Sequence, residues 1–245
     1  MKQYILAHRG ASGYAPENTL EAFELAQKMG ADGVELDVHL TRDGELVVAH
    51  DETVDRVSDG SGWIRDMRLA ELKRLHFNKT FPQYTDARIP TLREVFELLK
   101  PSGMEINIEL KNSYIDYPDL ELRVIELIHT DYIAEKIIFS SFNHHSMLRV
   151  KKLDPSFRCG LLYEANLVEP WNYAKTLGVD ALHPHFSETL VTKGECAAAH
   201  ALGIEVNTWT VNEEEYIRAV LREGADRIIT NYPDRALKIL KEEYK

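Results

Sequence analysis

The chain alternates short apolar runs with longer amphipathic runs along almost its whole length. The apolar runs have the length and residue types of β-strands, and the amphipathic runs have the residue spacing of α-helices. The predicted strands cover residues 4–9, 33–51 (one strand with an extension), 105–111, 136–142, 158–164, 180–186, 204–210 and 226–231. The predicted helices cover residues 18–30, 119–130, 144–152, 169–177, 188–202, 213–222 and 233–244, and one more begins at Thr91. Eight strand–helix units in about 250 residues predict an α/β fold, the (β/α)8 TIM barrel.

The alternative architecture is a doubly wound open sheet, which also alternates strands with helices. That fold usually carries a glycine-rich phosphate-binding turn after its first strand. Residues 8–13 (HRGASG) hold two glycines at this place, but not with the GxGxxG spacing. A weak internal repeat favours the barrel, because residues 30–37, 178–185 and 224–231 each lead through a G-x-D turn into an apolar strand.

One long segment, residues 52–90, interrupts the alternation. It contains several charged residues and the stretch SDGSGW at residues 58–63. A connection of roughly forty residues is uncommon in a compact domain and is usually functional or disordered. Residues 67–77 within it have helical spacing. We therefore expect a single TIM-barrel domain over residues 1–245, with a small inserted subdomain at residues 52–90.

The composition argues against several partners and compartments. With 29 Lys and Arg against 40 Asp and Glu, the formal net charge is −11, so nucleic acid is not an expected partner. Cys159 and Cys196 form neither a CxxC pair nor a disulfide framework, which suits a reducing compartment. The first apolar run ends at Ala7 and no stretch approaches 18 apolar residues, so neither a signal peptide nor a transmembrane helix is expected. We expect a cytoplasmic protein without stable membrane association, and the oligomeric state stays open.

The helix predicted at residues 18–30 has signals at both ends. Asn18 is the expected N-cap, and Glu21 stands three residues later, at the spacing of a capping box. Gly30 is the expected stop, because glycine readily adopts the left-handed conformation that ends many helices.

Three carboxylates occupy late positions on two predicted strands. Glu35 and Asp37 alternate with apolar residues and share one face of their strand, and Glu109 ends a later strand. In a barrel these side chains would meet at the mouth, where three converging carboxylates repel one another. Exposure to solvent, or pairing with Lys111 and Arg9, would relieve the repulsion. A hard divalent cation would also relieve it, and Mg²⁺ or Ca²⁺ suits oxygen ligands better than zinc.

Two histidines and two basic residues stand at the same ends of the predicted strands. His8 and His50 each follow an apolar run and each precede a charged residue, in the pairs HR and HD. A lone histidine is most often a hydrogen-bonded core residue, but a pair can act as general base and general acid in one turnover. Arg9 and Lys111 can contact an anion such as phosphate, or can pair with the carboxylates. A divalent cation, two basic side chains and two imidazoles together suit an anionic phosphoryl centre.

These motifs, in this order, resemble the glycerophosphodiester phosphodiesterase family over essentially the whole chain. The combination of HRG, ExD, HD and a later ELK is specific, whereas each piece alone is weak. The matching segments are AHRGASGYAPENTLEAF (7–23), GADGVELDVHLTRDGELVVAHDETVDR (30–56), IPTLREVFELL (89–99), INIELK (106–111), NTWTVN (207–212) and GADRIITNYPD (224–234). The resemblance implies a phospholipase-C-like phosphodiesterase barrel that hydrolyses small glycerophosphodiesters to glycerol 3-phosphate and an alcohol.

The resemblance also implies the roles of individual residues, by match of motif. It implies an acid–base pair, a ligand set for one divalent cation (Mg²⁺ or Ca²⁺), two phosphate contacts and a wall of the glycerol pocket. The residues at these positions are, in the same order, His8 and His50; Glu35, Asp37 and Glu109; Arg9 and Lys111; and Trp209 with the weaker candidate Phe142. The segment 52–90 matches the insertion of the family. His39 matches no family role, and we expect a structural or supporting part for it.

Two segments depart from the usual family pattern. Residues 55–60 read DRVSDG where family members often read DRTT, and residues 230–233 read TNYP where many read TDYP. We expect neither segment to touch the metal or the proton-transfer groups, so that the departures would alter the shape of the pocket and not the activity.

Two other functions stay open at the level of the sequence. The same barrel and metal could serve a lysophospholipase D or an enzyme acting on another phosphodiester. No basic amphipathic helix for membrane binding accompanies the barrel, which favours the small substrates. A non-catalytic barrel that binds phosphorylated ligands would be expected to lack one of the two histidines or three carboxylates, and all five are present. The sequence also leaves open whether water or the 2-hydroxyl of the substrate's glycerol is the nucleophile.

Overall fold

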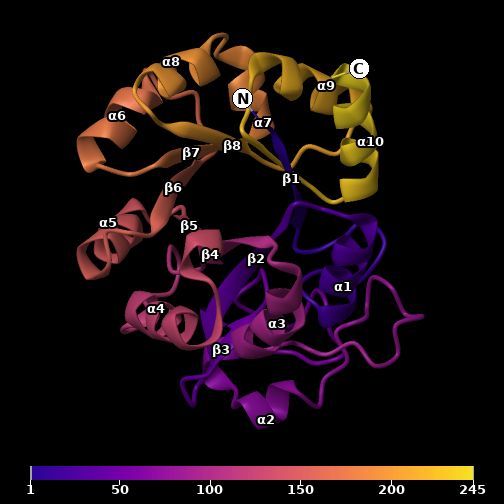
Figure 1. Cartoon of the computed structure of the whole chain (residues 1–245). Coiled ribbons are helices and arrows are strands. Elements are labelled where there is room, and N and C mark those ends of the chain that lie inside the picture. The colour runs from indigo at the N-terminus through magenta and orange to yellow at the C-terminus, as the bar shows by residue number, and fades with distance from the viewer. Residues whose placement is uncertain (1, 245) are drawn as a thin grey trace.

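The computed structural model describes residues 2–244 and contains eight parallel strands that close into a barrel (Figure 1). The strands pair in the order β1-β2-β4-β5-β6-β7-β8-β9, and β9 pairs again with β1. Their bounds are β1 Tyr4–His8, β2 Gly33–Leu40, β4 Glu105–Leu110, β5 Ile137–Ser141, β6 Arg158–Tyr163, β7 Ala181–Pro184, β8 Glu205–Thr208 and β9 Arg227–Thr230. The predicted TIM barrel is confirmed. The doubly wound open sheet is wrong, because the β1–β9 pairing closes the ring of strands.

Helices cover the outside of the barrel (Figure 1), and an extensive apolar cluster fills the layer between them and the strands. Their bounds are α1 Leu20–Met29, α3 Leu92–Leu99, α4 Leu120–Asp131, α5 His144–Leu153, α6 Pro170–Leu177, α7 Phe186–Val191, α8 Glu195–Ala201, α9 Glu214–Glu223 and α10 Pro233–Glu243, with the short 3₁₀ turns η2 Lys100–Ser102 and η3 Ala134–Lys136. The single helix predicted at residues 188–202 is two helices, α7 and α8. Gly194, with a φ of 83°, has the left-handed conformation that separates them.

Strand β4 shows how alternation along a strand supplies the interior of the barrel with polar groups. Ile106 and Ile108 belong to the apolar cluster under the helices. Asn107 and Glu109 have the opposite parity and line a cavity inside the barrel. The period of two therefore separates a dry outer layer from a polar interior that a ligand can reach.

The extension that was predicted as the end of the second strand is a separate strand, β3 (Leu46–Val48). It runs antiparallel to β2 and takes no part in closing the barrel. The chain reverses at a turn in which Gly44 has a φ of 82°. The return brings the backbone N–H of Ala49 to the carbonyl of Asp37, at 3.1 Å. His50 consequently arrives at the barrel mouth from outside the ring of strands.

Residues 52–90 contribute no strand to the barrel. They contain η1 (Ile64–Asp66) and α2 (Leu69–Leu72), the latter near the bottom of Figure 1. Together with the residues around β3 they form a separate apolar cluster, made of Val47, Ala49, Val54, Val57, Ile64, Leu72, Phe77 and Ile89. The helix predicted at residues 67–77 is therefore much shorter than predicted. Its C-terminal part instead binds a loop, because the His76 backbone N–H donates to the Asp59 carboxylate at 2.8 Å.

The N-cap prediction for helix α1 is wrong by one residue. Thr19 is the cap, and its hydroxyl accepts a hydrogen bond from the backbone N–H of Ala22. Asn18 has a φ of 56° and donates its side-chain amide to the carboxylate of Asp37 at 2.8 Å. Gly30 ends the helix in the left-handed conformation, as predicted. The side chain of Asn18 therefore holds Asp37 at the barrel mouth and does not cap the helix.

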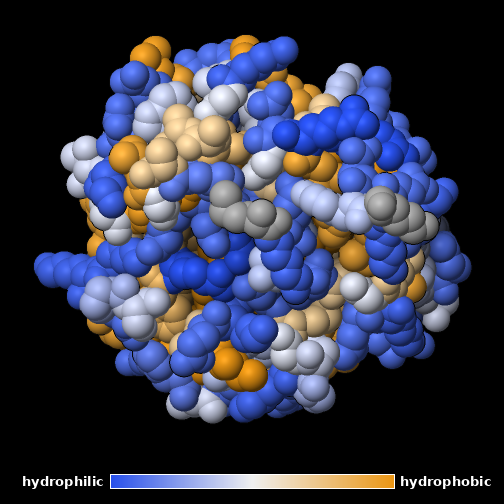
Figure 2. All heavy atoms as spheres, turned by 45° about the horizontal axis from the view of Figure 1, so that its top comes forward, coloured by the Kyte–Doolittle hydropathy of each residue, from blue (hydrophilic) through white to orange (hydrophobic). Residues whose placement is uncertain are grey.

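Within residues 2–244, no helix combines the length and the apolarity that crossing a membrane requires. Figure 2 shows a face on which hydrophilic residues predominate and hydrophobic ones lie scattered between them. Scattered hydrophobic residues of this kind are ordinary on protein surfaces.

Candidate active site

A cavity at the C-terminal ends of the barrel strands gathers most of the predicted site residues. The residues that line it are His8, Arg9, Glu35, His50, Asn107, Glu109, Phe142, Leu162, Trp209 and Ile229. The remaining two predicted residues lie against this lining. The Lys111 ammonium is 2.8 Å from the Glu109 carboxylate and 3.6 Å from that of Asp37. Active sites of TIM barrels lie at this end of the strands.

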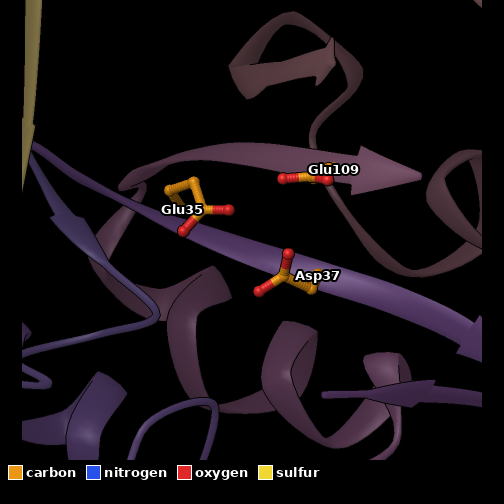
Figure 3. Close-up of side chains that lie close together, drawn as sticks. All are labelled: Glu35, Asp37 and Glu109. Atoms are coloured by element: carbon orange, nitrogen blue, oxygen red, sulfur yellow. The ribbon is translucent and has the colours of Figure 1, made fainter. Parts of the chain in front are cut away.

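The three predicted carboxylates converge at this end of the barrel, as Figure 3 shows. Glu35 and Asp37 come from β2, and Glu109 comes from β4, where it is the register partner of Asp37. One oxygen of each carboxylate lies within 4.8 Å of the others, and all three side chains are buried. This acidic cluster (Glu35, Asp37 and Glu109) could hold a metal ion.

The three carboxyls differ in the direction in which their surroundings shift the pKa. Burial raises the pKa of Glu35 well above its usual value, and the neighbouring Asp37 and Glu109 raise it further. Burial also raises the pKa of Glu109, although Lys111 opposes the change. For Asp37, burial acts in the same direction, but the charges of Lys111, His50 and Arg9 outweigh it and lower the pKa. The surroundings therefore stabilise the charged form of Asp37 but not the charged forms of Glu35 and Glu109.

An unsatisfied oxygen in the acidic cluster, together with its ligand types, fits a divalent cation. One oxygen of Asp37 is buried without a hydrogen-bond partner in the described part of the chain. A buried acceptor without a partner is costly unless something occupies the position beside it. The donor set consists of carboxylate oxygens, which are the ligands that Mg²⁺ and Ca²⁺ prefer.

Arg9 is fixed at the edge of the acidic cluster by both its backbone and its side chain. Its backbone N–H donates to the Glu35 carboxylate at 3.0 Å, and its guanidinium donates to Glu17 at 2.9 Å. The guanidinium Nε lies 3.6 Å from Asp37 and is buried without a hydrogen-bond partner among the described residues. Pairing with carboxylates is therefore observed for Arg9, as it is for Lys111. The unsatisfied Nε–H leaves Arg9 a donor for an anion in the cavity.

His8 has a neutral hydrogen-bond partner. Its Nδ1 lies 2.7 Å from the Oδ1 atom of Asn231, and its Nε2 lies 3.9 Å from the Glu35 carboxylate. Burial and the charge of Arg9 lower the pKa of His8 to about 3. The expectation that the TNYP segment (230–233) touches no proton-transfer group is wrong, because the asparagine of this segment is the partner of His8.

His50 has a charged partner and a buried support. Its Nδ1 lies 2.7 Å from the carboxylate of Asp51, and this hydrogen bond is the main cause that lowers the pKa of Asp51. The Nε2 atom of His39 lies 3.2 Å from the backbone carbonyl of His50, and the Nδ1 of His39 lies 3.0 Å from the Tyr117 hydroxyl. His39 thus connects the buried interior to the backbone that carries His50.

Two aromatic residues form the apolar wall of the cavity. Phe142, just after β5, and Trp209, just after β8, meet edge to face with their ring centroids 5.6 Å apart. The indole N–H of Trp209 donates to the carbonyl of His183 at 2.8 Å, which fixes the ring. The structure therefore brings the two predicted wall residues together on the side of the cavity lined also by Leu162 and Ile229.

Sequence reasoning missed the neutral amides of the site. Asn18 and Asn231 each hold one predicted site residue, Asp37 and His8 respectively. Asn107 lines the cavity beside Glu35 in register, and its Oδ1 is buried without a hydrogen-bond partner in the described chain. The parity of Asn107 with Glu109 in the segment INIELK could have indicated it.

The model of the Glycerophosphoryl diester phosphodiesterase family matches residues 8–235, and the match begins at His8 itself. The chain belongs to this family. The matched region contains the whole cavity lining and every residue of the acidic cluster. The family assignment therefore rests on the same part of the chain that forms the candidate site.

Relatives of full length agree with the family. A glycerophosphodiester phosphodiesterase of Caldanaerobacter subterraneus subsp. tengcongensis is 41% identical, over 99% of each chain. One of Bacillus altitudinis is 42% identical, over 97% of this chain and 98% of the relative. The solved structure of a phosphodiesterase of Oleispira antarctica, in complex with the product sn-glycerol 3-phosphate, has a TM-score of 0.92 and 31% identity, and the match covers 98% and 97% of the two chains.

Proposed function

We propose that this family member hydrolyses glycerophosphodiesters, such as glycerophosphocholine or glycerophosphoethanolamine, to glycerol 3-phosphate and an alcohol in a metal-dependent reaction. The observation that carries the proposal is the convergence of the buried acidic cluster with two histidines in one cavity. The similarity to full-length phosphodiesterases, one of them solved with glycerol 3-phosphate as its product, supports the substrate class.

Glu35, Asp37 and Glu109 would hold the one divalent cation, Mg²⁺ or Ca²⁺. When bound, such a cation supplies positive charge that polarises a phosphoryl oxygen. Arg9 and Lys111 would bind the phosphate, the first through its free Nε–H and the second as a point charge. Both residues also neutralise the carboxylates before substrate arrives, so the cavity presents positive charge to an anionic substrate only when the cation is present.

The two histidines would divide proton transfer between them. His8 faces the neutral amide of Asn231 and is uncharged at neutral pH, so its Nε2 can accept a proton from the nucleophile. His50 instead has a carboxylate partner, because its Nδ1 lies 2.7 Å from Asp51. This asymmetry favours His8 as the general base and His50 as the general acid that protonates the leaving alkoxide.

The remaining walls would select the glycerol part of the substrate. Trp209 and Phe142 would cover its carbon skeleton, because their rings form the apolar side of the cavity. We propose in addition that residues 52–90 act as an inserted subdomain, since they share an apolar cluster separate from that of the barrel. It follows His50 directly in the chain, and Arg56 within it pairs with Asp51, the hydrogen-bond partner of His50.

The test measures the release of glycerol 3-phosphate from glycerophosphocholine and glycerophosphoethanolamine by the full-length protein. We expect turnover with Mg²⁺ or Ca²⁺, none with EDTA, and recovery when the cation is restored. Lysophosphatidylcholine serves as the comparison substrate for a lysophospholipase D.

Three outcomes would contradict the proposal in different parts. Turnover that EDTA does not change would refute the metal site. Faster hydrolysis of lysophosphatidylcholine than of both small diesters would assign the barrel to lipid substrates. Binding of glycerophosphocholine without any hydrolysis, with either cation present, would make the protein a binding barrel.

A further inference from the structure

A continuous chain of ion pairs crosses the mouth of the barrel from Arg9 to His50. The Arg9 guanidinium donates to the Glu17 carboxylate at 2.9 Å. Arg56 donates to both oxygens of Glu17, each at 2.7 Å, and to both oxygens of Asp51, at 2.7 and 3.1 Å. Asp51 in turn accepts from Nδ1 of His50 at 2.7 Å. Two members of this series of ion pairs, Glu17 and Arg56, have no part in the proposed chemistry.

Arg56 lies at the centre of this series of ion pairs, and all three nitrogens of its guanidinium donate hydrogen bonds. It makes paired hydrogen bonds to two different carboxylates, and these bonds are the main cause that raises its pKa. A planar guanidinium fixes two carboxylates in one plane, which an ammonium cannot do. The side chain is nearly half exposed, so the Coulomb attraction is screened. Its contribution is therefore geometric more than energetic.

The backbone that carries Arg56 is itself held in place. Val54 and Val57 on either side of it are buried in the apolar cluster of residues 52–90. The buried Ser58 closes the turn, because both its backbone N–H and its hydroxyl donate to the carbonyl of Val54, at 3.0 and 2.8 Å. The guanidinium thus projects from a packed turn toward the barrel. Asp51, in contrast, lies in a loop and is itself partly exposed.

We propose that Arg56 is a positioning residue for the reaction, an inference that rests on the proposed function. By fixing the Asp51 carboxylate it fixes the orientation of the His50 ring through the hydrogen bond at Nδ1. Without Arg56, Asp51 is free to turn toward water, and His50 loses its oriented partner. Substituting a residue that supports a reacting side chain in this way typically lowers activity by about 10- to 100-fold. A small displacement of a reacting group lowers the rate by a similar factor.

The test compares Arg56→Ala with Arg42→Ala in the cation-loaded, full-length enzyme. Arg42 is the matched control, because its guanidinium pairs with a single exposed carboxylate, that of Glu71 at 3.4 Å. For Arg56→Ala we expect kcat to fall about 10- to 100-fold with KM changed less than about threefold, and for Arg42→Ala we expect no change in kcat. Added guanidinium ion at millimolar concentration should restore part of kcat in Arg56→Ala only.

A second measurement separates positioning from a general loss of structure. In the double variant Asp51→Asn, Arg56→Ala, kcat should be no lower than in Asp51→Asn, because the arginine then has no aspartate to fix. Nitrogen-detected NMR of His50 should show an Nδ1–H that is hydrogen-bonded to Asp51 in the wild type, and the loss of this hydrogen bond in Arg56→Ala.

The proposal is overturned by a wild-type kcat in Arg56→Ala. It is equally overturned by additive losses in the double variant, or by a loss of kcat that follows the thermal midpoint and does not respond to guanidinium. Failure of the proposed function would look different, since the wild type itself would then release no glycerol 3-phosphate.

Discussion

The two ends of the barrel both contain buried charged groups, but only one end neutralises them. At the end where the strands begin, Arg227 donates to Glu105 at 2.9 Å and to Glu205 at 2.7 Å, and Arg158 donates to Glu105 at 3.0 Å. Glu105 and Glu205 thus each have a guanidinium partner. At the mouth, the acidic cluster has three carboxylates for the two basic groups Arg9 and Lys111.

Strand β4 carries one carboxylate at each end of the barrel. Glu105 is paired with guanidinium groups and Glu109 belongs to the acidic cluster, and the two lie on the same face, four residues apart. For Glu105, burial acts to raise the pKa, but the hydrogen bonds and charges of Arg227 and Arg158 outweigh it and lower the pKa. For Glu109, burial prevails and raises the pKa. Glu105 thus has a structural role at the start of β4, whereas Glu109 at its end is available to bind a ligand. The comparison indicates that a buried charge which its partners do not fully compensate marks function, at a cost in stability.

The largest expected effect comes from replacing an unneutralised charge at the mouth with its neutral amide. Glu35→Gln should lower kcat/KM at least about a thousandfold, or about 4 kcal/mol in transition-state stabilisation, because the cation loses a charged ligand. In metal-free buffer the free energy of unfolding should not fall, since burial, Asp37 and Glu109 all oppose a charge at this position. Enzyme-linked detection of glycerol 3-phosphate and calorimetry with EDTA measure the two quantities. A metal-free variant that unfolds more easily than the wild type would contradict the comparison.

The matching change at the other end of the barrel should have the opposite profile. Glu105→Gln leaves Arg227 and Arg158 short of a buried partner and should lower the free energy of unfolding by about 3 kcal/mol. The substitution should leave kcat within about twofold of the wild type, because the residue lies at the far end of β4 from the cavity. Urea unfolding followed by circular dichroism, with kcat measured at 25 °C, tests both parts. A large loss of kcat in the folded variant would show that the two ends are not independent.

Replacing the histidines at the mouth should affect the rate without affecting cation binding. His8→Ala and His50→Ala should each lower turnover by at least about a hundredfold, or about 2.7 kcal/mol, the usual scale for lost acid–base catalysis. Cation affinity, measured by calorimetric titration, should be retained because neither imidazole belongs to the acidic cluster. Turnover close to that of the wild type in either variant would remove that histidine from the mechanism.

The sequence predicted the barrel and the convergence of the acidic cluster because both follow from local patterns. Alternation of apolar and polar residues assigns the strands, and parity along β2 places Glu35 and Asp37 on one face. The antiparallel return through β3 was not predictable in this way. A run of strand-forming residues carries the same pattern whether it continues a strand or reverses through a turn at Gly44.

The supporting residues of the site could not be predicted, because their roles depend on contacts between distant parts of the chain. Asn231 reaches His8 across 223 positions of sequence, and Arg56 reaches Glu17 across 39. Local rules even misassigned Asn18, which has the residue type of an N-cap and serves Asp37 instead. An amide or a guanidinium in a loop carries no periodic signal, so only the closed barrel shows which group it meets.

The smallest expected effect concerns His183 on β7, whose side chain lies in the barrel interior against Asn207 and is affected by the charge of Arg227. His183 is fully buried, its Nε2 lies 2.9 Å from the side-chain nitrogen of Asn207, and burial together with the charge of Arg227 lowers its pKa to about 3. Because the unfolded chain binds a proton near pH 6.5 and the folded protein does not, stability is complete above pH 6.5 and falls toward pH 3. The slope from this one group is about 1.4 kcal/mol per pH unit.

The variant His183→Gln isolates this slope, since His8 and His39, whose pKa values are also lowered, titrate alike in both proteins. Urea unfolding of the metal-free proteins between pH 6.5 and 4.5 should show a shallower loss of stability in the variant, by about one proton. Equal slopes would mean that water or a rearranged Arg227 lets the folded protein protonate His183. The charged groups around Arg227 would then be more mobile than their ion pairs indicate. The two ends of the barrel would in that case differ in their access to a ligand and not in their balance of charges.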